Sequence, residues 1–142
     1  GGGFEFPFYP VAAGADNSCM SRNNLFQIQS ETIINLAEKG SSIFVGRAAD
    51  YILRDHPRML SIFLTADLED RINRVCTLAQ VDNSQAKQMI SECDKKRADF
   101  YNYYTFREWG NAAGYDMCLN TSVLSIDQVV EDIVKVVAEK FL

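Results

Sequence analysis

The chain has 142 residues, of which 47% are hydrophobic and 23% are charged, and its formal net charge is −5. This composition is typical of a single folded domain, and the acidic balance argues against electrostatic capture of nucleic acid or of an anionic membrane surface. No apolar stretch approaches the roughly 18 residues of a membrane-spanning helix, and no charged and then apolar leader marks a signal peptide. We therefore expect partners other than nucleic acid and membranes.

The four cysteines lie far apart and form no CxxC pair: Cys19, Cys76, Cys93 and Cys118. The chain also has a single histidine, so it lacks the ligand spacing of a structural zinc site. This pattern is typical of buried or half-buried reduced thiols in a cytoplasmic protein. We predict no metal site.

Residues 1–24 differ in composition from the rest of the chain. Three glycines open the segment, aromatic residues alternate at positions 4, 6 and 8, and prolines stand at Pro7 and Pro10. Two prolines without a sustained hydrophobic period favour extended, irregular backbone over a helix. We expect this segment to be a linker or a remnant of a larger element, with residues 25–142 forming the folded domain.

The first part of this domain is predicted to be a helix, a strand and a helical turn. From Asn24 onward, apolar residues recur at helical spacing and predict an amphipathic helix that ends at Lys39. The apolar segment 42–45 predicts a buried strand. A helical turn is expected over 51–53, before the proline at position 57.

The rest of the chain alternates between strand and helix patterns. We predict strands over 60–64 and 115–119, with helices over 67–79 and 83–104 between them. A capping-box pattern that opens at Ser125 predicts a final helix with an apolar face. Strands that alternate with helices indicate an α/β fold built on a parallel sheet with right-handed crossovers.

The strand predicted over 42–45 ends in Gly46 and Arg47. Glycine lets the backbone turn sharply there, and the arginine is then expected at the carboxyl edge of the sheet, where anionic ligands bind in open α/β proteins. A guanidinium group is planar and permanently charged, which suits it to phosphate. Asp50 is expected either to cap the following helical turn or to support an arginine or accept from a ribose hydroxyl.

The helix predicted over 83–104 carries a second basic site. Its apolar stripe passes through Arg97, and a cation on that stripe is costly unless it is paired or faces a ligand cleft. Asp94 is spaced to pair with it, so a structural ion pair is the alternative to a phosphate site. Lys96 belongs to the same basic run, for which a solvated helix surface is the alternative.

Two further candidates follow the third predicted strand. Thr121 and Ser122 are expected to contact a nucleotide base or ribose. The sequence also lacks the motif G-x-x-x-x-G-K-[ST], which forms the glycine-rich cradle for the β- and γ-phosphates of ATP. The given residues therefore contain no recognisable phosphate loop.

With these residues laid out, the chain over residues 25–142 resembles the cytidylate kinase-like family of nucleoside monophosphate kinases. Each matching segment is short, and it is their order along the chain that carries the resemblance. The segments are 43–47, 62–66, 69–71, 94–98, 101–105, 119–122 and 124–129.

The resemblance implies a P-loop NTPase fold, of the nucleoside monophosphate kinase type, that transfers a phosphoryl group from ATP, with Mg²⁺, to a nucleoside monophosphate such as CMP. It places Arg47 near the acceptor phosphate, and it points to Arg97, with Lys96 beside it, as lid residues that clamp the transferring phosphates. The mechanism it implies is positioning and charge neutralisation. The family's cytidylate kinases have Gly-Arg-Asp, whereas here two alanines separate Arg47 from Asp50, which leaves the acceptor base open.

The missing phosphate loop leads to two expectations. One is that the sequence represents part of a kinase-like protein whose first strand, phosphate loop and first helix lie upstream. The alternative is a non-catalytic α/β module that binds a phosphorylated ligand or a protein partner. An exposed sheet position would then favour a homodimer.

Overall fold

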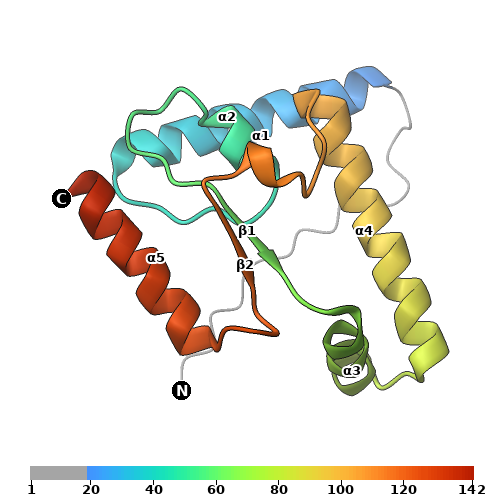
Figure 1. Ribbon diagram of the computed structural model, residues 1–142. Helices are drawn as coiled ribbons and strands as arrows, with labels where there is room; N and C mark the ends of the chain where they lie inside the picture. Colours follow the sequence, from blue (N-terminus) through green and yellow to red (C-terminus); the bar gives the residue numbers. More distant parts are fainter. Residues whose placement is uncertain (1–18) are drawn as a thin grey trace. The chain divides into compact units, whose positions relative to one another are not determined.

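The computed structural model describes residues 19–142 (Figure 1). The chain forms two compact units, residues 1–43 and residues 44–142, and each is described by itself. None of the helices in the described part of the chain combines the length and the apolar character needed to cross a bilayer.

The described part of the first unit contains helix α1 (Cys19–Lys39). The predicted end of this helix at Lys39 is confirmed. Its start lies earlier than predicted, inside the segment 1–24 that we expect to be irregular. Residues 19–24 contain neither glycine nor proline, so helical backbone can extend through them. The rest of that segment, residues 1–18, lies outside the described residues.

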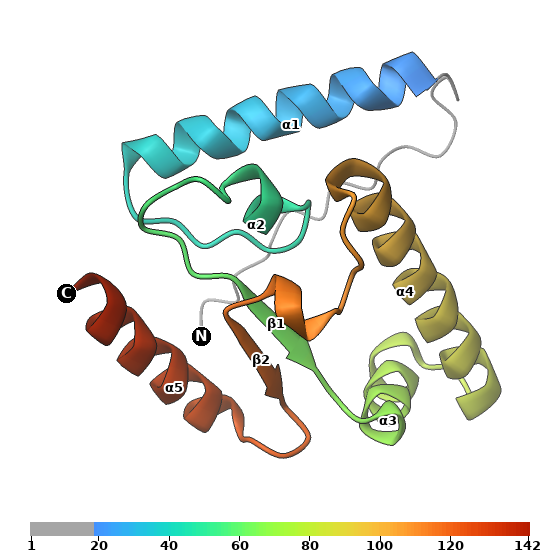
Figure 2. The same ribbon diagram turned by 45° about the horizontal axis from the view of Figure 1, so that its top comes forward.

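The second unit is a mixed α/β arrangement around a small parallel sheet. Its elements, in chain order, are α2 (Ala49–Ile52), β1 (Ile62–Thr65), α3 (Leu68–Ala79), α4 (Asn83–Thr105), the 3₁₀ turn η1 (Ala112–Gly114), β2 (Met117–Asn120) and α5 (Ile126–Phe141). The two strands pair in parallel, with Ile62 opposite Met117 and Thr65 opposite Asn120. Helices α3 and α4 lie to one side of the strands and α5 lies to the other (Figures 1 and 2).

These elements confirm most of the predicted order. The helices predicted over 67–79 and 83–104 match α3 and α4 to within one residue at each end. The later two predicted strands start two residues too early, at 60 and 115 where the structure has Ile62 and Met117. The fold class α/β with a parallel sheet is therefore correct, with a sheet of two strands among the described residues.

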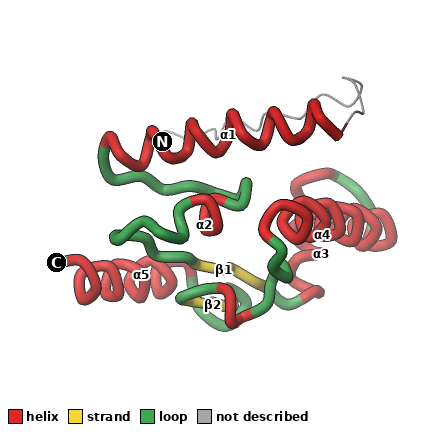
Figure 3. The backbone as a smooth tube through the Cα atoms, turned by 90° about the horizontal axis from the view of Figure 1, so that it is seen from above, coloured by secondary structure: helices red, strands yellow, loops and turns green. Residues whose placement is uncertain are grey.

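The strand predicted over 42–45 is wrong. The stretch between α1 and α2 is loop (Figure 3), and Ile43 and Val45 are 91% and 72% exposed. A strand is defined by its hydrogen bonds to a neighbour, and within the described residues β1 pairs only with β2. An apolar, β-branched sequence without a partner strand therefore stays a loop.

The interior of the second unit is centred on the contact between α3 and α4. Ile72 from α3 packs with Ala86 and Ile90 from α4, and Ala86 is fully buried. Helix α4 starts at a capping box in which Asp82 accepts from Gln85 N and the Gln85 side chain accepts from Asp82 N. Packing and capping together fix the helix that carries much of the candidate site.

The expectation of buried thiols holds only in part. Cys76 is half-buried, whereas Cys93 and Cys118 are exposed, and all three are free. The prediction that Cys118 is buried or half-buried is wrong, because strand residues alternate between the two faces of a sheet. Its neighbours Met117 and Leu119 are half-buried, which leaves the Cys118 side chain on the open face.

Candidate functional site

A left-handed turn presents Arg47 ahead of α2. Gly46, Arg47 and Ala48 have φ values of 70°, 57° and 56°, so three consecutive residues occupy the left-handed region. For residues with a Cβ this conformation costs roughly 1–2 kcal/mol each. The predicted sharp turn at Gly46 is confirmed, and it leaves the Arg47 side chain exposed.

Asp50 in the first turn of α2 is joined to α4 by a hydrogen bond. The Tyr101 hydroxyl donates to Asp50 Oδ2 at 2.7 Å. Tyr101 is only 5% exposed, and burial together with the bond and charge of Asp50 raises the pKa of its hydroxyl. The neutral, donating form of Tyr101 is therefore stable at every physiological pH, and the bond ties the Arg47 turn to the long helix.

Arg107 approaches the same place from the loop after α4. Its guanidinium carbon lies 5.2 Å from the centre of the Tyr51 ring, and that of Arg54 lies 3.9 Å from the same ring. Arg107 also lines a hollow of about 380 Å³ together with Glu108, Asn111, Ala113 and Gly114. A further cation thus stands next to the helix that carries Asp50.

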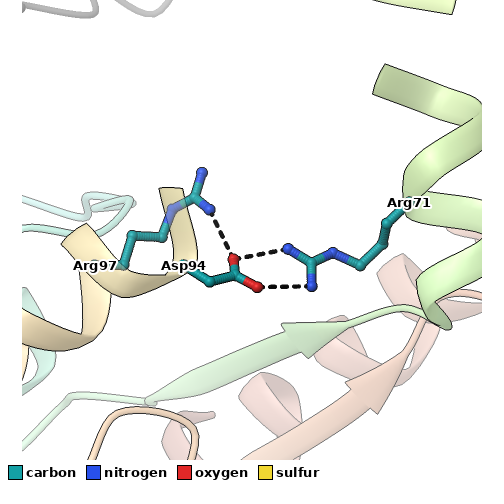
Figure 4. A network of polar contacts seen from close by, with 3 residues as sticks. All are labelled: Arg71, Asp94 and Arg97. Carbon is teal, nitrogen blue, oxygen red and sulfur yellow. Dashed lines mark hydrogen bonds and ion pairs between the residues drawn. The ribbon is translucent and has the colours of Figure 1, made fainter. Parts of the chain in front are cut away.

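A second cluster of charges centres on Asp94 of α4. Arg71 from α3 donates two hydrogen bonds to the Asp94 carboxylate, at 2.9 and 2.7 Å, and Arg97 donates one at 3.2 Å (Figure 4). The two arginines reach the carboxylate from opposite sides (Figure 4). The hydrogen bonds from Arg71, followed by the charges of both arginines, hold the pKa of Asp94 below its usual range.

The predicted pairing of Asp94 with Arg97 is confirmed, but Arg97 does not lie on the buried stripe of α4. Its side chain is 56% exposed, while that of Asp94 is 27% exposed. The buried residues of the helix are Ala86, Ile90, Tyr101 and Thr105. Between Ile90 and Tyr101, positions 94 and 98 are half-buried whereas position 97 is exposed, so the carboxylate occupies the stripe and the cation projects beside it.

The remaining predicted site residues are Lys96, on the exposed surface of α4, and Thr121 and Ser122, in the loop after β2. Lys96 is exposed, and its neighbour Lys95 pairs with Asp99 at 2.6 Å. Thr121 Oγ1 donates to Thr65 O at 3.1 Å, and Ser122 Oγ accepts from the backbone N of residue 67 at 2.8 Å. Both hydroxyls thus connect the loops that follow β1 and β2, at the carboxyl ends of the strands.

Sequence reasoning missed two residues at this site. Tyr101 reaches the site through its bond to Asp50, which spans 51 positions of the sequence. Arg107 lies just beyond the end of α4 and follows no periodic pattern. Both residues reach the site through contacts between elements, which hydrophobic spacing does not reveal.

Unfolding at low pH is expected to depend on Asp94. Because its folded pKa lies below that of the unfolded chain, Asp94 contributes stability above the unfolded value of about 4, and that contribution disappears as the pH falls through the folded pKa. We expect Asp94→Asn to be less stable than wild type near about pH 7, with the difference shrinking as the pH falls below the unfolded value of about 4. Urea denaturation of both proteins over this pH range measures the difference in their free energies of unfolding. A difference that does not change with pH would contradict the prediction.

The donor set of the described residues suits anions. No group of three or more His, Cys, Asp or Glu side chains gathers in residues 19–142. Two of the exposed arginines in this part of the chain, Arg47 and Arg97, are predicted phosphate-binding residues, and their guanidinium groups match phosphate oxygens in charge and fork geometry. The chemistry available to these residues is the binding and neutralisation of an anion.

The sequence profile of the cytidylate kinase-like family matches residues 6–123. The chain belongs to the cytidylate kinase-like family. The match starts earlier than the resemblance over 25–142 predicts, and it ends before α5. All candidate residues from Arg47 to Ser122 fall inside it. Membership of this family indicates a nucleotide kinase-like function in general.

Among solved structures, this member of the cytidylate kinase-like family is similar to an uncharacterized protein from Eubacterium ventriosum. The two share 31% sequence identity with a TM-score of 0.79, and the similarity covers 82% of this chain and 73% of that chain. This supports the mixed α/β arrangement. A comparison with curated proteins found no match.

Proposed function

We propose that this family member is a nucleotide-binding phosphotransferase that transfers the γ-phosphate of ATP to a nucleoside monophosphate such as CMP. One observation carries the proposal: the 2.7 Å bond between Tyr101 and Asp50 joins the turn that bears Arg47 to the helix that bears Arg97. Arg97 precedes Tyr101 by one turn of α4, about 6 Å along the axis. The exposed side chains of Arg47 and Arg97 therefore belong to two elements that this hydrogen bond connects.

The two arginines have separate roles in this proposal. Arg47 binds the acceptor phosphate from its turn, and Arg97 neutralises charge on the transferring phosphoryl group, with Lys96 next to it. Arg71 already satisfies Asp94 with two hydrogen bonds, whereas Arg97 adds a single, longer one. Arg97 can therefore turn toward a phosphate without leaving the carboxylate unpaired.

The remaining contacts of the nucleotide complete the proposal. The carboxylate of Asp50 has a second oxygen that can accept from a ribose hydroxyl, and the loop of Thr121 and Ser122 is the proposed contact for the base or ribose. ATP with Mg²⁺ is the proposed phosphoryl donor, and a P-loop NTPase arrangement is the proposed complete fold. The free thiols favour a cytoplasmic protein, and the exposed apolar segment 42–45 favours a homodimer.

The proposal is tested by incubating the protein with ATP and Mg²⁺ in the presence of CMP, dCMP or UMP, and following ADP formation. We expect ADP formation that requires one of these acceptors, compared with a control that lacks any acceptor. ADP formation that does not respond to acceptor would contradict a monophosphate kinase.

A non-catalytic binding module is the second candidate, because the given sequence contains no glycine-rich phosphate loop. Calorimetric titration with CMP separates the two functions. Binding of CMP without ADP formation supports the binding module. Absence of binding of CMP, and of dCMP and UMP titrated in the same way, contradicts both the kinase and a nucleotide-binding module.

A further inference from the structure

The hydroxyl of Tyr101 contacts neither substrate in the function proposed above, yet it donates a hydrogen bond to a carboxylate of the site. It is buried, and its bond to Asp50 at 2.7 Å has the short length of a charge-assisted hydrogen bond. A Phe at this position would fill the same space. The hydroxyl is therefore the part of the side chain whose purpose needs an explanation.

Helix α2, which carries Asp50, is too short to be stable without contacts from other elements. Helix α2 has four residues, its N-cap Ala48 makes no side-chain capping bond, and the preceding turn consists of left-handed residues. Its local hydrogen bonds run from Ala49 N to Gly46 O, from Tyr51 N and Ile52 N to Ala48 O, and from Leu53 N to Ala49 O, at 3.2, 3.1, 3.0 and 2.9 Å, so they span a single turn. A single helical turn of this length is unstable alone, so contacts from elsewhere must hold it.

Tyr101 is well placed to supply such a contact. Its ring stacks on Tyr115, with centroids 6.4 Å apart, and Tyr115 contacts Phe63 of β1 at 4.9 Å. The hydroxyl thus projects from a side chain that α4 and the sheet both fix. The burial of Ala48 and the contact of Arg107 with the Tyr51 ring support α2 as well, but neither is a hydrogen bond to Asp50.

We propose that Tyr101 is a positioning residue: through its hydrogen bond to Asp50 it fixes the turn Gly46 to Ala48 in the conformation that presents Arg47 to the acceptor phosphate. The effect on catalysis rests on the proposed function, in which Arg47 binds that phosphate. The effect on the conformation of the turn does not depend on the proposed function, because it is measured in the protein without ligand.

Two measurements on Tyr101→Phe test this inference, with Tyr103→Phe as the matched control. Tyr103 lies on the same helix, is 60% exposed and also loses only a hydroxyl. In the free protein, we expect amide hydrogen exchange at Ala49 and Tyr51 to become about tenfold faster in Tyr101→Phe and to stay unchanged in the control. In the assay, we expect the KM for CMP to rise about tenfold while the KM for ATP is unchanged.

A second pair of variants tests the bond from its other end. Asp50→Asn keeps an oxygen that accepts from Tyr101, whereas Asp50→Ala does not. We expect exchange at Tyr51 to stay near wild type in Asp50→Asn and to speed up in Asp50→Ala. Combining Asp50→Ala with Tyr101→Phe should add nothing further, because both remove the same bond. This pair also decides the matter if Tyr101→Phe fails to fold.

The outcomes separate the inference from the proposed function. Unchanged exchange at Ala49 and Tyr51 in Tyr101→Phe and in Asp50→Ala would overturn the positioning role. A fall in kcat with both KM values unchanged would also overturn it, because that pattern reflects a smaller folded fraction. Faster exchange in a protein that binds no CMP would support the positioning of the turn and overturn the proposed function.

Discussion

The variant Arg47→Ala is expected to lower kcat/KM for CMP by about 10²-fold, the loss found when one preorganised electrostatic contact is removed from a transition state. Arg47 stands on a turn whose backbone lies in the left-handed region, so the direction in which its side chain leaves the backbone is set before substrate arrives. Alanine carries a Cβ as arginine does, so the backbone strain of this position is unchanged. Much of the loss should lie in the KM for CMP, because this residue binds the acceptor.

Two controls make the Arg47 result specific. Arg47→Lys keeps the charge but loses the planar fork, and we expect an activity between those of wild type and alanine. Arg74→Ala removes an exposed arginine from α3 and should leave turnover within about twofold of wild type. Equal activities of Arg47→Ala and Arg74→Ala would show that charge at Arg47 does not bind the substrate.

The variant Arg97→Ala is expected to lower kcat by about 10²-fold with a small change in the KM for CMP. This split follows from its proposed role, since a cation that neutralises the transferring phosphoryl group acts mainly in the transition state. Asp94 keeps both hydrogen bonds from Arg71 in the variant, so its carboxylate stays paired. Steady-state kinetics at varied CMP and ATP measure the split.

Stability measurements separate catalysis from structure at Arg97. The pair with Asp94 involves a 56% exposed arginine, and exposed pairs contribute at most about 1 kcal/mol. We therefore expect the Tm to fall by no more than about 4 °C. Lys95→Ala removes a neighbouring exposed pair and should keep normal turnover. Unfolding of Arg97→Ala would favour a structural ion pair, and normal turnover would remove Arg97 from the site.

Local sequence patterns predicted the helices and the turn of this protein well. The bounds of α3 and α4, the sharp turn at Gly46 and the pairing of Asp94 with Arg97 are all set by residues close in sequence. Helical hydrogen bonds and pairs three residues apart depend on the segment alone, so the sequence contains the information they need.

The failures have a common physical origin in contacts between distant segments. The segment 42–45 has a strand-like composition, but pairing depends on a neighbour that its own residues do not specify. The bond of Tyr101 to Asp50 and that of Arg71 to Asp94 span 51 and 23 positions. The second of these bonds explains why α4 tolerates a carboxylate on its half-buried stripe, with Arg97 displaced to its exposed edge.

A crystal structure of the protein with CMP tests the central claim most directly, because it locates the acceptor phosphate. We predict a phosphate oxygen within about 3 Å of the Arg47 guanidinium, with the bond between Tyr101 and Asp50 retained. A CMP phosphate bound away from Arg47 would contradict this account. So would crystals without bound CMP after soaking at saturating concentration.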